Sequence, residues 1–215
     1  MLRRTAPLAL LLVASCLVSS GCASTLKSSR VRPDYEAQDK ARLKRLVVLT
    51  APAPEGQEPV GELWSRIARR YVNQKRHFIA KAHAAHPERP TPDGLKQLCT
   101  EAAEGLEGVL WLEPMNVRRV GTGKDVGVEA GVRAQLTRCT DGQEVWRAEA
   151  AGSWPSEDAE LKESAALWTS GLDPSVEPFA APTFRLLRPT LDSLPEPTPL
   201  VTDEEVMEKG EAEAF

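Results

Sequence analysis

The most constraining feature of the sequence is a strict two-residue alternation between positions 126 and 137. Apolar residues occupy every second position, namely Val126, Val128, Ala130, Val132, Ala134 and Leu136. Glycine and mostly polar residues occupy the positions between them. Side chains of a strand point alternately to its two faces, so this pattern predicts one packed and one largely solvated face. Asp141-Gly142 then predicts a hairpin turn, because both residues tolerate positive φ, and the return strand places Trp146, Ala148 and Ala150 on one face.

Other apolar patterns predict the remaining elements. Short apolar runs at 46–49 and from Val109 to about Val117 are typical of buried strands. Helices are expected over about 60–82, after Thr91, after Ser156 and over about 179–194. The expected fold class is therefore α/β, with a single mixed sheet of about four strands and amphipathic helices packed against it over residues 44–194.

The N-terminus has the parts of a secretory signal peptide. Two arginines open the chain, an apolar stretch follows from Ala6 to Val18, and small residues precede Cys22. As a helix this stretch reaches only about 20 Å, short of a hydrocarbon core of about 30 Å. Ser20-Gly21-Cys22 resembles the bacterial lipobox, whose cysteine thiolate takes up a diacylglyceryl group. Residues 1–21 are predicted to be a lipoprotein signal peptide with lipidation at Cys22, and Cys16 is the alternative acceptor, although cleavage there leaves a very short apolar run.

Two segments of the mature chain are expected to lie outside the folded domain. Residues 22–43 are polar and without apolar periodicity, which indicates a tether, and residues 195–215 are acidic and Pro-rich, which indicates a disordered tail. From Asp192 onward, eight acidic residues and one lysine give a net charge of −7. Removing that charge and the two signal arginines from the total of −4 leaves +1 for residues 22–191. A nearly neutral domain does not indicate a nucleic-acid partner.

The residue after the lipidated cysteine bears on location. Ala23 stands where many inner-membrane lipoproteins of Gram-negative bacteria have Asp. By that resemblance, the domain is expected to be anchored by covalent lipid in the outer membrane, facing the periplasm. In that oxidising compartment Cys99 and Cys139 are a candidate disulfide. Two buried, inert thiols are the alternative, because sequence does not supply the Cα separation that the bond requires.

His83 and His86 are weak candidates for a metal site. A spacing of three residues can place two imidazoles on one face of a helix. No carboxylate stands at a supporting spacing, and Pro87 follows at once, so solvated histidines at a helix end are the plainer interpretation. The basic residues from Arg66 to Lys81 could bind anionic lipid or an acidic polymer, or form the solvated face of a packed helix.

No motif of an established catalytic class is present in the sequence. It contains no Gly-x-Ser-x-Gly, no His-Glu-x-x-His, no P-loop and no Gly-x-Gly-x-x-Gly. Acidic residues are scattered without pairing, and the tryptophans fall mainly within apolar patterns. We therefore expect a protein that is not an enzyme and that binds no cofactor and no metal.

The run Val109-Leu-Trp-Leu, the alternating strand and Asp141-Gly142-Gln-Glu-Val-Trp146 resemble a family of uncharacterised bacterial lipoproteins. More distantly, residues 44–194 are similar to the periplasmic lipoprotein domains of PelC, LpoB and CsgG and to the N-terminal domain of TolB. The resemblance implies a sheet with helices on its faces, in a ring-forming or partner-binding part of an envelope machine.

Two functions are compatible with these observations. The first is a lipid-anchored, non-enzymatic envelope component that binds a partner protein or forms a homo-oligomer for export, secretion or wall assembly. The alternative is a cell-wall glycan- or metal-binding module or a cryptic envelope enzyme, which the basic helix and the histidines suggest.

Overall fold

A six-stranded sheet organises the chain in the computed structural model, which describes residues 25–52, 58–122 and 126–214. The strands are β1 (Thr25–Val31), β2 (Arg45–Thr50), β3 (Ile79–Ala85), β4 (Gly108–Val120), β5 (Gly127–Arg138) and β6 (Glu144–Pro155), in the order β1-β6-β5-β4-β2-β3. β2 is parallel to both of its neighbours, whereas β4, β5, β6 and β1 pair antiparallel. The sheet is therefore mixed, as predicted, but it has six strands and not about four.

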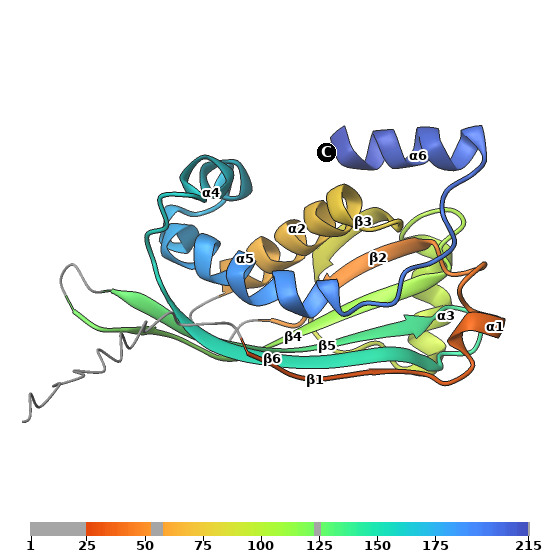
Figure 1. Ribbon diagram of the computed structural model, residues 1–215, viewed down its shortest axis with the longest axis horizontal. Helices are drawn as coiled ribbons and strands as arrows, with labels where there is room; N and C mark the ends of the chain where they lie inside the picture. Colours follow the sequence, from red (N-terminus) through yellow and green to blue (C-terminus); the bar gives the residue numbers. More distant parts are fainter. Residues whose placement is uncertain (1–24, 53–57, 123–125, 215) are drawn as a thin grey trace, which may run out of the picture.

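Helices cover the two faces of the sheet unequally (Figure 1). They are α1 (Tyr35–Gln38), α2 (Glu58–Lys75), α3 (Pro92–Glu101), α4 (Lys162–Thr169), α5 (Glu177–Asp192) and α6 (Asp203–Ala214), with a short 3-10 turn at Pro174–Val176. α2 and α5 pack on one face of the sheet, and they enclose the main core with side chains from β2, β3, β4, β5 and β6. α3 packs on the other face, where Leu95 joins Val47, Val109 and Trp111 in a smaller core over β2 and β4.

The alternating segment forms β5 as predicted. Its apolar positions from Val128 to Leu136 are buried in the main core, whereas Arg133 between them is exposed. The turn after β5 contains Gly142 with φ of +70°, the left-handed conformation that the Asp-Gly signal indicated. The strand that follows buries Trp146, Ala148 and Ala150 on the same face. The buried and exposed faces of a half-buried strand can thus be predicted from its sequence pattern.

The helix expected over about 60–82 is confirmed up to residue 75 and is wrong after it. α2 ends at Lys75, and the apolar run after it becomes β3, beside β2. Asn73 stabilises this break, because its side chain accepts a hydrogen bond from the Ala80 amide at 2.7 Å and donates one to the Ala80 carbonyl at 3.1 Å. The Lys209 ammonium group donates to the carbonyls of Val72, Arg76 and Phe78, and so it ties the end of α2 to the segment that leads into β3. A short run of small apolar residues is compatible with the helical repeat of 3.6 residues and with the strand repeat of two. These tertiary contacts decide in favour of the strand.

The segment expected to be a tether over 22–43 is folded from residue 25. Thr25–Val31 is β1, which pairs antiparallel with β6 from Thr25 opposite Ala151 to Val31 opposite Trp146. Residues 35–38 then form the short helix α1, where Tyr35 is buried. β1 is an edge strand with exposed side chains, so its residues show no apolar alternation. Backbone pairing, which has little dependence on side chains, forms it.

The C-terminal segment expected to be disordered over 195–215 is also folded, up to the last described residue, 214. α6 lies over α2 and β3 (Figure 1). Glu205 pairs with Lys44, and Glu208 pairs with Arg45 and Lys81. The composition that suggested disorder is therefore the composition that docks this helix on basic residues. Within the described residues, no helix is long and apolar enough to cross a membrane.

Candidate functional site

The anchor predicted at Cys22, the alternative at Cys16 and the signal peptide lie outside the described residues. The first described residue, Thr25, already begins β1. Only Ala23 and Ser24 stand between it and Cys22, so the two Cα atoms, three peptide units apart, are separated by at most about 11 Å. A lipid on Cys22 would therefore hold the sheet close to the bilayer, and not at the end of a long tether.

The face of the sheet that α3 covers at β2 and β4 lacks helical cover at β6, β1 and most of β5 (Figure 1), although Gln135 and Thr137 near the end of β5 are buried on this face. Three charged side chains cross this uncovered face in register: Glu113 on β4, Arg133 on β5 and Glu149 on β6. Arg133 is 3.1 Å from Glu113 and 3.0 Å from Glu149, and hydrogen bonds to the two carboxylates raise its pKa. Such exposed pairs contribute little to stability, so the face is polar, ion-paired and open to a polar partner surface.

The free edge of the sheet next to this face is β1. Its outer backbone groups have no neighbouring strand among the described residues, and the side chains from Leu26 to Val31 are exposed. Lys27 and Arg30 form no ion pair with any described residue. An edge strand with charged residues is protected against pairing with stray strands. Sequence reasoning missed this edge because it assigned these residues to a tether.

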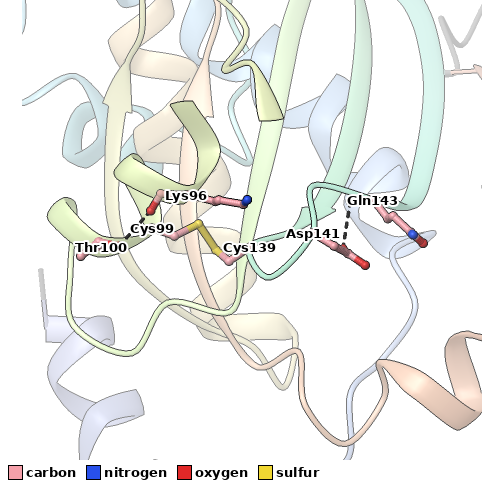
Figure 2. The surroundings of a disulfide bond; sticks show 6 residues. All are labelled: Lys96, Cys99, Thr100, Cys139, Asp141 and Gln143. Carbon is pink, nitrogen blue, oxygen red and sulfur yellow. Dashed lines mark hydrogen bonds between the residues drawn. A yellow bond between two sulfur atoms is a disulfide. The ribbon is translucent and has the colours of Figure 1, made fainter. Parts of the chain in front are cut away.

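Cys99 and Cys139 are joined by a disulfide (Figure 2). Cys99 lies on α3 and Cys139 follows the end of β5, with their Cα atoms 6.0 Å apart. Near the bond, Thr100 donates to the Lys96 carbonyl within α3, and the Gln143 amide donates to Asp141 within the β5–β6 turn. The bond ties a helix that makes few other contacts to the rim of the sheet, which is a structural role.

His83 and His86 do not lie together on a helix face, as the metal-site interpretation required. His83 is in β3 and His86 follows the end of that strand, so an odd spacing directs successive side chains to opposite faces. Burial and the nearby Arg69 and Arg66 lower the pKa of His83. The rings of His86 and Trp111 are nearly perpendicular, with their centroids 6.3 Å apart. The described part of the chain contains no cluster of three His, Cys, Asp or Glu residues that could hold a metal ion.

The basic side chains between 66 and 81 are mostly engaged within the protein. Arg66 donates to the Ser170 carbonyl at 2.6 Å, and Arg69 donates to the Ala80 carbonyl at 3.0 Å. Arg76 pairs with Glu196 at 2.9 Å and Lys81 with Glu208 at 3.2 Å. Through these contacts the basic side chains bind the segment after α4, β3 and the C-terminal segment. Most of the charges suggested for binding an anionic polymer therefore already have partners within the protein.

No protein-family model and no curated protein matches the sequence of this chain. Structural neighbours exist at low identity. A PelC dodecamer from Paraburkholderia phytofirmans is 18% identical, with a TM-score of 0.40, over 73% of this chain and 97% of that one. A hypothetical protein, CT253, from Chlamydia trachomatis is 12% identical, with a TM-score of 0.40, over 69% of this chain and 94% of that one. The lipoprotein GNA1162 from Neisseria meningitidis is 13% identical, with a TM-score of 0.34, over 59% of this chain and 96% of that one.

Proposed function

We propose that this protein is a lipid-anchored, non-enzymatic cell-envelope lipoprotein that acts as a partner-binding or oligomeric accessory component of an export, secretion or wall-assembly system. The observation that carries the proposal is the position of β1. This strand begins three residues after Cys22 and is paired into the sheet. The lipid would thus fix the folded domain itself at the membrane surface.

The polar, uncovered half of the sheet supports the partner-binding part of the proposal. Arg133, Glu113 and Glu149 are fixed by strand register, so they present an ordered array of charge. An ordered polar surface of this kind gives specificity for a protein partner or a second copy more than raw affinity. Among the described residues, the lowered pKa of Glu205 comes from Lys44, and the raised pKa of Tyr71 comes from burial and from Asp192; both are structural contacts.

Acylation is tested by metabolic labelling with palmitate and by membrane fractionation of the full-length protein. We expect labelling and membrane association in the wild type and in Cys16→Ser, and loss of both in Cys22→Ser. Labelling that survives Cys22→Ser but not Cys16→Ser would instead identify Cys16 as the acceptor. Absence of label from the wild type would refute the lipoprotein assignment.

The outer-membrane location is tested by density-gradient separation of the two membranes. We propose that Ala23 permits transport to the outer membrane, so Ala23→Asp should retain the acylated protein in the inner membrane. Ala23→Ser is the matched control and should leave the distribution unchanged. Wild-type protein found in the inner-membrane fraction would contradict this location.

Partner binding is tested by light scattering after size exclusion and by pull-down from solubilised membranes. Charge reversal in Arg133→Glu, on the uncovered face, should weaken the assembly. Arg188→Glu changes an exposed arginine on α5, whose nearest carboxylate, Asp192, is 4.0 Å away, and should not weaken it. A monomer without any captured partner would contradict the accessory role.

A further inference from the structure

We define the β1 edge surface as the exposed side chains of Leu26, Lys27, Arg30 and Val31. It contains two basic and two apolar side chains. Leu26 is 36% exposed and Val31 is 37% exposed, which places them among the few large apolar residues at the described surface. Residues 25–32 include Lys27, Arg30 and Arg32 but no acidic residue. Arg32 is engaged with Asp34, so Lys27 and Arg30 remain as cations without an ion pair among the described residues.

The strand register adds a second observation that points to an anionic partner. Arg30 lies directly opposite Arg147 of β6. Like charges at directly opposed positions of an antiparallel pair destabilise it. The carboxylate of Glu144 is 3.6 Å from Arg147, and this exposed pair compensates only part of the repulsion between the two arginines. An anion beside Arg30 at the edge would relieve this repulsion.

The position of the anchor indicates which anion this is. Lys27 is five residues after Cys22 and Arg30 is eight, so a lipid on Cys22 brings both within reach of phospholipid headgroups. Basic residues beside a lipid anchor are attracted to anionic lipids, and apolar side chains next to them, here Leu26 and Val31, enter the interface. The backbone groups of a free edge require water or other polar partners, so the edge suits the headgroup layer and not the hydrocarbon core.

We propose that the β1 edge surface lies against anionic phospholipid headgroups, with the strands of the sheet parallel to the membrane. The inference rests on the proposed lipidation at Cys22. Because the strand order begins at β1 and ends at β3, the sheet then stacks away from the bilayer. β3 would lie about 24 Å above β1 at about 4.8 Å per strand. α6, which covers β3, would therefore face away from the membrane with its exposed Val206 and Met207.

The end of β4 offers a weaker membrane contact. This end carries Arg118 and Arg119 beyond the start of β1, but Arg118 is paired with Glu129 at 2.6 Å. Only Arg119 remains as a cation without an ion pair among the described residues. The β1 edge surface offers more unpaired charge and lies nearer to the anchor along the chain.

Orientation can be measured with the full-length acylated protein in vesicles of phosphatidylcholine with and without phosphatidylglycerol. An environment-sensitive fluorophore is attached at Ser28→Cys on β1, at Arg119→Cys on β4 or at Met207→Cys on α6, with the native disulfide kept oxidised. Quenching by headgroup spin-labelled lipid should be strongest at position 28 and weakest at position 207, and phosphatidylglycerol should increase the difference. Strongest quenching at 119 or 207, or equal quenching at all three sites, would overturn the proposal.

Removing the two cations tests their role. Lys27→Gln/Arg30→Gln should shift the equilibrium away from the edge-down orientation about 30-fold, at about fivefold for each cation near an anionic surface. Arg118→Gln/Arg119→Gln is the matched control and should leave the quenching at position 28 unchanged. Self-quenching between position-28 labels without quenching by lipid would show a second copy on the edge and would also overturn the proposal. Vesicle flotation separates the two hypotheses. Wild-type protein that carries no acyl group and does not float contradicts the proposed function, whereas acylated protein that floats without the expected quenching pattern contradicts only the orientation.

Discussion

The ammonium group of Lys44 lies 2.6 Å from Oε1 of Glu205, although 161 residues separate them in the chain. Both side chains are largely shielded from water, with exposed fractions of 9% and 10%. The other carboxylate oxygen of Glu205 accepts hydrogen bonds from the amides of Val201 and Thr202. This carboxylate thus caps the first turn of α6 and, through Lys44, also fixes the helix to the chain directly before β2.

Loss of this carboxylate should release α6. Glu205→Ala leaves Lys44 buried without its partner, and breaking one side of a buried pair costs about 3–5 kcal/mol. We expect a decrease of that order in the free energy of unfolding in urea, together with faster amide exchange in α6. Glu204→Ala, at the exposed neighbouring position, should leave both measurements nearly unchanged. Similar losses in the two variants would mean that the ion pair is not what docks the helix.

The same pair predicts an acid-sensitive C-terminus. The Lys44 hydrogen bond, followed by the backbone amides, lowers the pKa of Glu205 from 4.5 to about 2. A carboxylate with a lowered pKa stabilises the folded state fully above its unfolded pKa and loses that contribution as the pH falls toward the folded value. Docking of α6 should therefore weaken between about pH 4.5 and 2, as followed by a fluorophore on Met207→Cys. Glu205→Gln should remove this pH dependence, and an unchanged acid transition in that variant would contradict the assignment.

The disulfide should contribute strongly to stability. It closes a loop with a sequence separation of 40 residues, for which the chain-entropy model gives about 4 kcal/mol. We expect Cys99→Ser/Cys139→Ser to unfold at lower urea concentration than the oxidised wild type by an amount of that order. Added reductant should lower the stability of the wild type but not of the double variant. Equal stability of the oxidised wild type and the double variant would show that α3 holds its position without the bond.

Gly127 should tolerate no side chain. A Cβ atom at this position would lie 2.6 Å from the Trp154 carbonyl oxygen, which is backbone of the neighbouring strand. We expect Gly127→Ala to destabilise the protein by about 1–3 kcal/mol, as overpacking does. At Gly210 in α6, a Cβ atom would meet nothing within 4 Å. Gly210→Ala should therefore stabilise the helix by about 0.5–1 kcal/mol, and the opposite signs of the two changes are the check by thermal unfolding.

The candidate site was only partly predictable. The spacing of His83 and His86 suggested a shared helix face because the break after Lys75 depends on contacts made by Asn73 and Lys209. The sequence was compatible with a disulfide between Cys99 and Cys139 or with two free thiols. The packing of α3 on the sheet brings the two residues together and forms the bond. The uncovered face and the β1 edge surface have no local signature, because exposure depends on which helices cover which strands.

Local pattern alone determined the elements that carry their own burial period or cap. β5 and β6 follow from alternation and an Asp-Gly turn, and α3 begins at Thr91, whose hydroxyl accepts a hydrogen bond from the Gly94 amide at 3.1 Å. Tertiary structure decided β1, β3 and α6. β1 is held by backbone pairing with β6. β3 forms because α2 ends at Lys75 and the chain after it pairs with β2. α6 is held by cations on distant elements, such as Lys44. A half-buried strand records its surroundings every second residue, whereas an edge strand and a helix docked by ion pairs obtain their stability from partners elsewhere in the chain.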